Sequence, residues 1–170
     1  VKTKYFLFTQ ADIKIDENSI DNLIKGMKLR EDIIFAGPIF SSKESFNKKN
    51  ELVENYKLKS ALDASIMMCD TEKVKKIGFF DEDYFLYWED KDLMERVSKS
   101  DFKMIQILNS FVDHDYGKST LDDLKDKFIR RINFKYGELL FDLKHKKLRK
   151  IKILRQIIQN IFLLPLNLTF

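Results

Sequence analysis

Short apolar runs alternate with segments of helical periodicity along this chain, and that alternation limits its fold more than any other feature. Residues 5–8 form an apolar run typical of a buried strand, whereas residues 19–29 have apolar side chains at the spacing of one helical face. Strands that alternate with helices predict an α/β fold. In sequence order, the predicted elements are strand 5–8, helix 19–29, strand 33–38, strand 62–69, short helix 71–76, helix 91–99, strand 102–108 and long helix 121–143.

Turn and capping residues predict where several of these elements begin and end. Asn18 or Ser19 is expected to cap the first helix, and Asp70 is expected to cap the short helix. The Gly-Pro pair at 37–38 predicts the end of the second strand. Residues 41–59 are polar and rich in Lys and Asn, which indicates a surface loop.

The composition is that of an ordinary globular domain with one cysteine. The chain has 170 residues, of which 44% are hydrophobic and 34% are charged, so it can bury a core. A single cysteine excludes a disulfide within the chain and a zinc site built from cysteines. Cys69 lies in an apolar run, where the ordinary expectation is a small core residue.

The net charge of +4 conceals a sharp division of charge along the chain. Residues 1–142 contain 24 basic side chains and all 27 acidic ones, whereas residues 143–170 contain seven basic side chains and no acidic one. Such a division predicts different roles for the body and the tail. No apolar run approaches the ~18 residues of a membrane-spanning helix.

The basic residues of the tail lie on a segment with helical spacing. Apolar residues recur at helical intervals from Leu148 to Ile161, which indicates a basic amphipathic helix. Contact with an anionic membrane surface is the first interpretation, and an ordinary helix packed on the domain is the second. Nucleic acid is not expected, because no aromatic residue interrupts the basic run. The candidate membrane-contact residues are Lys146, Lys147, Arg149, Lys150, Lys152 and Arg155.

Residues 81–92 combine six acidic side chains with four aromatic ones. A solvated charge run would not carry four aromatic residues, and a core strand would not carry six acids. The mixture is typical of a pocket wall, in which aromatic rings exclude water and carboxylates accept protons. An exposed turn that is both acidic and aromatic is the alternative. An EF-hand is excluded, because its ligand pattern is missing.

Asp12 and His114 are candidate site residues on weaker grounds. Each follows a predicted strand, and ligands collect at strand ends in open α/β sheets. Many aspartates at such positions only cap a turn, and a single histidine is more often a hydrogen-bonded structural residue. His145 lies among lysines and is expected to be solvated.

Taken in order, these pieces resemble a known family. The pattern comprises the strand that ends at Asp12, followed by residues 77–82 (IGFFDE), 85–96 (FLYWEDKDLMER) and 114–119 (HDYGKS). This resembles the rhamnosyltransferase-like branch of the family 2 glycosyltransferases, over about residues 4–140. The resemblance implies a GT-A fold, here a partial sheet with flanking helices and a helical tail. It also implies inverting transfer of a sugar from a nucleotide-diphosphate donor.

The same resemblance implies a metal site. Gln10-Ala11-Asp12 occupies the place of the family's acidic motif, so Gln10 and Asp12 are the candidates for contact with the donor diphosphate. Asp12 and His114 are the candidate metal ligands, for Mg²⁺ or Mn²⁺. Gln10 departs from the carboxylate that relatives often have at its position.

The Glu89-Asp90 pair matches the family's acidic pair. The resemblance implies that one of the two removes the proton of the acceptor hydroxyl, and Asp90 is the residue we favour. Repulsion between adjacent carboxylates raises one pKa toward the working pH. Asp92 and Arg96 have the (i, i+4) spacing of a helical ion pair, which predicts a structural role. The candidate acceptor-binding residues are Asp81, Glu82, Tyr87 and Trp88.

The domain prediction follows from the same comparison. Residues 1–120 would form the acceptor and metal side of the domain, and residues 121–170 a helical basic extension. Family members place a nucleotide-binding β-α-β-α-β region before the strand of Asp12, and the sequence lacks it. The expected function is sugar transfer to a glycan or lipid-linked acceptor in cell-surface glycan synthesis, at the cytoplasmic face of the membrane. The alternative is a truncated, non-enzymatic interaction module or an inactive remnant.

Overall fold

A computed structural model describes residues 2–40, 55–114, 124–147 and 150–163. The chain divides into two compact units. The first comprises Val1–Glu82 and Glu89–Asp122, and the second comprises Asp83–Trp88 and Asp123–Phe170. The segment Asp83–Trp88 therefore belongs to the same unit as the C-terminal helices, although it interrupts the first unit in the sequence.

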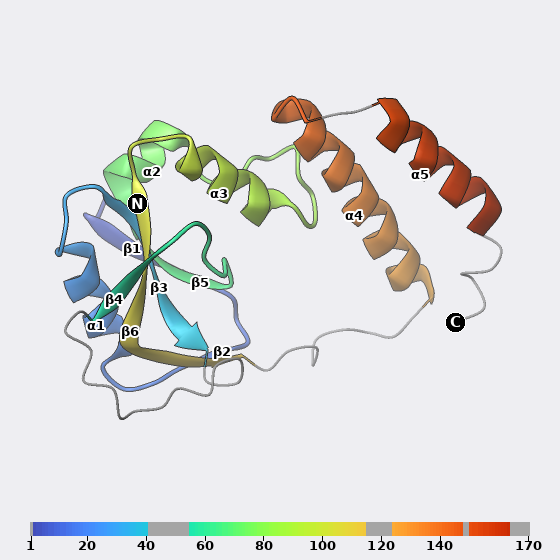
Figure 1. Ribbon diagram of the computed structural model, residues 1–170. Coiled ribbons are helices and arrows are strands. Elements are labelled where there is room, and N and C mark those ends of the chain that lie inside the picture. The colour runs from blue at the N-terminus through green and yellow to red at the C-terminus, as the bar shows by residue number, and fades with distance from the viewer. Residues whose placement is uncertain (1, 41–54, 115–123, 148–149, 164–170) are drawn as a thin grey trace. The chain divides into compact units, whose positions relative to one another are not determined.

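The first unit is built on a six-stranded mixed sheet with the strand order β1-β5-β3-β6-β2, in which β4 also pairs with β6 (Figure 1). This confirms the predicted α/β class. Its elements are β1 (Tyr5–Thr9), β2 (Ile13–Ile15), α1 (Ser19–Met27), β3 (Ile33–Phe40), β4 (Tyr56–Lys59), β5 (Ile66–Asp70), α2 (Thr71–Ile77), α3 (Glu89–Ser98) and β6 (Lys103–His114).

The directions of the strands show which strand ends lie at the same side of the sheet. Strand β3 is parallel to β6, and β5 is antiparallel to both β1 and β3, so β1, β3 and β6 run in the same direction. Their C-terminal ends therefore meet at one edge of the sheet. Ligands bind at this edge in open sheets of this kind.

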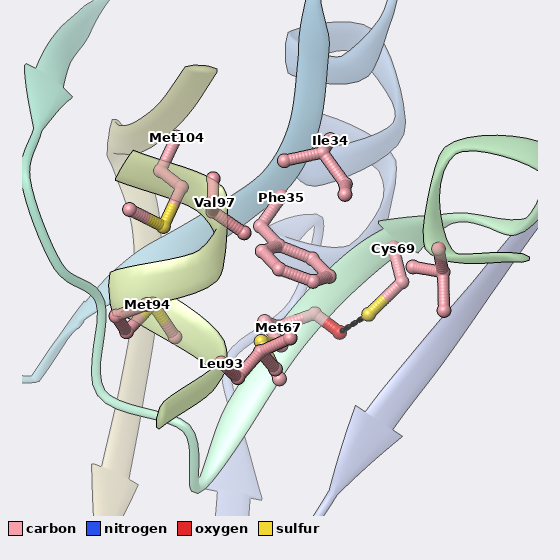
Figure 2. Packing of buried hydrophobic residues seen from close by; sticks show 9 residues of the cluster. Ile34, Phe35, Met67, Cys69, Leu93, Met94, Val97 and Met104 are labelled. Atoms are coloured by element: carbon pink, nitrogen blue, oxygen red, sulfur yellow. Dashed lines mark hydrogen bonds between the residues drawn. The ribbon is translucent and has the colours of Figure 1, made fainter. Parts of the chain in front are cut away.

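Both faces of the central strands are covered by helices, which explains why β3 is buried along its whole length. Side chains of β5 alternate between the two faces. Met67 and Cys69 join a cluster with residues of α2 and α3, whereas Met68 joins a cluster with residues of α1. Figure 2 shows the first cluster, in which Leu93 and Val97 of α3 pack over Phe35.

Cys69 is the core residue that its apolar surroundings predict. Its side chain is fully buried, and its Sγ donates a hydrogen bond to the carbonyl oxygen of Met67 at 3.5 Å (Figure 2). Burial raises the pKa of the thiol to about 12. The thiol is therefore protonated at neutral pH and is unreactive in the folded protein.

Strand β3 does not end at its Gly-Pro pair, so that prediction is wrong. The strand continues through Pro38 to Phe40, and its pairing with β6 shifts register between Gly37 and Ile39. Such a bulge accommodates a proline, because proline has no N–H to donate to the neighbouring strand. The longer strand places Phe40 at the side of the sheet where β1, β3 and β6 end.

Two further differences concern the polar residues around β6. Residues 56–59 form strand β4 on the outer edge of β6, not part of a surface loop, and the rest of the predicted loop, residues 41–54, lies outside the described residues. Strand β6 extends from Lys103 to His114, so His114 lies within the strand and not after it. Strands at the edge of a sheet, and strands with one face in solvent, carry polar residues. A search for apolar runs therefore does not recognise β4 or the end of β6.

The N-terminus of α1 is held by tertiary contacts. Asn18 has the left-handed conformation (φ 65°) and makes no side-chain capping bond. The Oγ of Ser19 instead accepts a hydrogen bond from the N–H of Phe111 and donates one to the carbonyl oxygen of Phe111, at 2.8 and 2.9 Å. The predicted capping role is therefore wrong for both residues, because the Ser19 hydroxyl joins α1 to β6.

The second unit contains two helices, α4 (Leu124–Lys144) and α5 (Lys150–Leu163). The predicted basic amphipathic helix is observed as α5, which begins at Lys150, so Lys146 and Lys147 lie before it in a turn that follows Lys144. The N–H of Lys147 donates to the carbonyl oxygen of Asp142 at 2.7 Å, and this bond closes the turn. The first residues of the predicted long helix, 121–123, lie outside the described part of the chain.

The candidate membrane-contact residues are divided between this turn and α5. Lys146, Lys147, Lys150 and Arg155 are exposed, whereas Arg149 and the side chain of Lys152 lie outside what the structure describes. Across the described helices, none combines the length and apolar character needed to cross a bilayer.

Candidate functional site

Asp12 and His114 meet at the edge where β1 and β6 end. Asp12 lies in the turn between β1 and β2, and His114 pairs with Ile13 of β2 as the last residue of β6. The Nε2 of His114 lies 3.2 Å from the Oδ2 of Asp12. The histidine side chain is only 9% exposed and the aspartate side chain 35%, so the pair is partly shielded from water.

The spacing of the pair is that of a direct hydrogen bond, and it is also compatible with two ligands of one divalent ion. Two ligands that occupy adjacent positions of an octahedral ion, each about 2.1 Å from it, lie about 3 Å apart. The observed separation of 3.2 Å is close to this value. Among the described residues, no group of three or more His, Cys, Asp or Glu side chains could hold a metal. The remaining ligands would have to come from water or from the oxygens of a bound substrate.

Two further residues, Phe40 and Gln10, make contacts at this side of the sheet. The ring of Phe40 lies 6.2 Å from the imidazole of His114, measured between centroids. The backbone N–H of Gln10 donates to the carbonyl oxygen of Ser65 at 2.8 Å, which joins the Gln10-Asp12 segment to the start of β5. Phe40 was not recognised as a candidate site residue, because the Gly-Pro pair was interpreted as the end of its strand.

Glu89 and Asp90 begin helix α3 and have different surroundings. Burial, and then the neighbouring charge of Asp90, raises the pKa of Glu89 above its ordinary value. The Oε2 of Glu89 is buried and accepts no hydrogen bond from the described residues. Asp90 instead accepts a hydrogen bond from the N–H of Lys91 at 2.7 Å. The carboxylate with the raised pKa is therefore Glu89, the neighbour of the residue that we favoured as the base.

Glu89 should make the stability of the protein depend on pH. A carboxyl group whose pKa is higher in the folded state stabilises the fold below its unfolded pKa, here about 4.5, and this stabilisation is lost as the pH rises through the higher folded value. We expect Glu89→Gln to weaken the decline of the urea unfolding midpoint that accompanies a rise in pH above about 4.5. The exposed Glu82→Gln serves as the control. Identical pH profiles for Glu89→Gln and the wild type would contradict the assignment.

Asp92 and Arg96 form the predicted ion pair, which the structure confirms. The Nε of Arg96 donates to the Oδ2 of Asp92 at 2.7 Å, and the aspartate side chain is only 2% exposed. The two terminal nitrogens of Arg96 donate to the carbonyl oxygens of Ile77, Gly78 and Phe79. One guanidinium thus fixes the segment before Asp81 to helix α3.

The predicted acceptor-binding residues have dissimilar surroundings. Asp81 is half-buried and Glu82 is exposed. Within the second unit, the Trp88 ring lies 5.6 Å from the ring of Phe134 and 5.3 Å from that of Phe141, and Tyr87 lies 5.8 Å from Phe134. Their aromatic rings therefore pack against helix α4.

Tyr87 and Trp88 also have an unusual backbone conformation. Both have positive φ angles, 68° and 74°, in the left-handed region that non-glycine residues rarely occupy. The left-handed conformation raises the free energy of the folded state by about 1–3 kcal/mol for each such residue. It persists only where contacts with surrounding residues stabilise it. Helix α4 supplies these contacts through Phe134, Phe141 and Gly137.

Gly137→Ala should loosen this contact. A Cβ at position 137 would lie 2.9 Å from the Cδ1 of Trp88 and 3.0 Å from the carbonyl oxygen of Tyr87. The overpacking should cost ~1–3 kcal/mol. Alanine in a helix interior would otherwise stabilise by ~0.5–1 kcal/mol relative to glycine. Trp88 is the only tryptophan of the chain, so its fluorescence reports the change directly.

The expected result is a red-shifted tryptophan emission and a lower unfolding midpoint in Gly137→Ala. Tyr136→Ala, at an exposed neighbouring position on the same helix, is the matched control. An emission maximum equal to that of the wild type, together with an unchanged midpoint, would show that the close approach of the two segments is not required.

Comparison with known proteins identifies no relative of this chain. The sequence matches no protein-family model and no curated protein.

Proposed function

We propose that the protein is the acceptor-side part of an inverting glycosyltransferase. It would transfer a sugar from a nucleotide-diphosphate donor to a glycan or lipid-linked acceptor in cell-surface glycan synthesis. The observation that carries the proposal is the close approach of Asp12 and His114, at 3.2 Å, at the edge where parallel strands end. The family resemblance assigns both residues to the site that binds the metal and the diphosphate.

The proposed reaction divides the work between two groups of residues. Asp12 and His114 would hold a Mg²⁺ or Mn²⁺ ion, which when bound supplies positive charge to the departing diphosphate. Gln10 lies beside them and is the further candidate for contact with the diphosphate. Among the described residues these two side chains supply only part of a coordination shell, which suits an ion that is completed by substrate oxygens.

A carboxylate at the start of α3 would activate the acceptor. Asp90 takes the proton of the acceptor hydroxyl while the hydroxyl oxygen attacks the anomeric carbon of the donor. The bond between that carbon and the diphosphate oxygen breaks, and the diphosphate leaves with the bonding electrons. Attack from the opposite face inverts the configuration of the carbon. Glu89 is the alternative base, because burial raises its pKa.

The basic turn and helix α5 are proposed to contact an anionic membrane surface. Lys146, Lys147, Lys150 and Arg155 are exposed, as are Ile151 (74%) and Leu154 (57%). Basic and apolar side chains exposed together are typical of a helix that lies at a lipid headgroup interface. This would keep a lipid-linked acceptor close to the enzyme.

The test of the function is metal-dependent binding of the donor. Calorimetric titration of a nucleoside diphosphate, with and without Mn²⁺, is carried out on this chain and on the chain extended by the coding sequence upstream of Val1. We expect Asp12→Asn to weaken Mn²⁺-dependent binding by about tenfold or more. Asp16→Asn, at a nearby exposed position, is the control and should bind normally.

The outcomes of this titration distinguish the proposed transferase from the alternative interaction module and test the role of Asp12. Unchanged metal dependence in Asp12→Asn would remove Asp12 from the metal site. Binding by neither chain would favour the alternative, an interaction module without catalytic activity. Binding by the extended chain only would indicate that the donor is held largely by residues outside this sequence.

A further inference from the structure

A cavity of about 190 Å³ lies beside the C-terminal half of β3 in the first unit. Its wall includes residues from β3, β4, β6 and the segment that precedes β5, so four parts of the sheet contribute to it. The residues that matter here are Gly37, Phe40, Lys59, Leu62, Asp63 and Gln106. None of them was a candidate site residue in the sequence.

The polar part of the wall offers hydrogen bonds to a guest. Gln106 is only 8% exposed, and its Nε2 lies 3.4 Å from the carbonyl oxygen of Pro38. Its side-chain carbonyl oxygen accepts no hydrogen bond from any described residue. Lys59 forms no ion pair within the described part of the chain. Both residues line the same small cavity.

A carboxylate is fixed in the same wall. The Oδ1 of Asp63 accepts hydrogen bonds from the N–H and the Oγ of Ser65, at 3.0 and 2.6 Å. These bonds fix the orientation of the side chain before any ligand arrives. A carboxylate held in this way is pre-organised to accept a hydrogen bond from a ligand hydroxyl.

The apolar part of the wall sets the size of the guest. Phe40, which is 6% exposed, and Leu62 also line the cavity. Gly37 leaves space here, because a Cβ would lie 3.1 Å from the Cδ2 of Leu62. A cavity of about 150 Å³ holds a benzene ring. The present volume therefore suits one six-membered ring with small polar substituents.

We infer that this cavity binds a single sugar ring, namely a glycosyl unit of the transferase substrate. The inference rests on the proposed function and extends it. Hydroxyl groups would pair with Gln106, Lys59 and Asp63, and the C–H face of the ring would lie on Phe40 and Leu62. Phe40, which lines the cavity, also lies 6.2 Å from the imidazole of His114, measured between ring centroids.

Saturation-transfer NMR tests the inference on the complete chain. The probes are the methyl glycosides of glucose, galactose, mannose, rhamnose and N-acetylglucosamine. We expect at least one to receive saturation from the wild type, with an affinity that falls about fivefold in Gln106→Leu and in Lys59→Met, as for one lost hydrogen bond. Lys57→Met is the matched control, because Lys57 lies on the same strand but outside the cavity wall.

The exposed position of Lys59 keeps the test informative if Gln106→Leu fails to fold. Saturation of no probe, or equal saturation of Lys59→Met and wild type, would overturn the inference. Failure here leaves the proposed function standing if Mn²⁺-dependent donor binding still requires Asp12. Conversely, sugar binding in the cavity without any donor binding would support the cavity and reject the transferase.

Discussion

Arg96→Met is expected to destabilise the first unit by about 3–5 kcal/mol, because it leaves a buried carboxylate without its cation. Asp92 is 2% exposed at its side chain, and Arg96 lies 2.7 Å from it. The same substitution removes the donors to three successive carbonyl oxygens, those of Ile77, Gly78 and Phe79. Equilibrium urea unfolding of the variant and the wild type measures the loss.

Two further variants show whether the buried charge is the cause. Lys99→Met removes an exposed pair with Glu95 at the same helical spacing, and should cost about 0–1 kcal/mol. The double variant Asp92→Leu/Arg96→Met removes both buried charges and should recover part of the lost stability. Equal losses for Arg96→Met and Lys99→Met would contradict the structural role of the Asp92–Arg96 pair.

Asp90→Asn should lower the turnover of sugar transfer by about 10²–10⁴-fold while donor binding persists. Asparagine has the same shape but cannot accept the proton of the acceptor hydroxyl. Initial rates of transfer measure the first quantity, and calorimetric titration of the donor measures the second. Near-normal turnover in Asp90→Asn would remove Asp90 from the role of base.

Glu89→Gln distinguishes the two carboxylates. If Glu89 is the base, its variant shows the larger loss of turnover, and the wild-type rate rises with pH through the raised pKa of Glu89. If Asp90 is the base, Glu89→Gln retains most of its activity. Asp101→Asn, at an exposed position outside the site, controls for the general effect of removing an acidic side chain.

Features that depend on neighbouring residues in the sequence could be predicted. The side chain of Asp70 accepts hydrogen bonds from the N–H groups of Glu72 and Lys73, as expected for the cap of a short helix. Helix α3 and its Asp92–Arg96 pair also appear where the sequence indicates them. Caps and (i, i+4) pairs are set by helix geometry alone, so no tertiary information is needed.

Features that depend on tertiary neighbours could not be predicted in the same way. The passage of β3 through Pro38 requires a register shift against β6, and the sequence does not encode that pairing locally. Strand β4 is polar because it lies at the edge of the sheet, on β6. The same limit applies to Ser19, whose hydroxyl bonds to Phe111 on a distant strand and does not cap its own helix.

The candidate site was predictable only in part. The family resemblance named Asp12 and His114, and the structure brings their side chains together through β2, a strand too short to recognise in the sequence. The resemblance gave no indication that Gln106 and Asp63 share a cavity wall, because Gln106 lies in β6, Asp63 precedes β5, and the two are far apart along the chain. Likewise, the contacts of Trp88 with Phe134 and Phe141 depend on helix α4, which lies well beyond it in the sequence.

The packing of Trp88 on α4 has a consequence for the order in which the protein is made. The ribosome releases Tyr87 and Trp88 long before Phe134, Gly137 and Phe141, so their left-handed backbone lacks its support while the nascent chain is still growing. The conformation of Tyr87 and Trp88 is therefore supported only after α4 has emerged. A premature stop codon before Leu124 would leave these two residues without the α4 side chains that pack against them in the second unit.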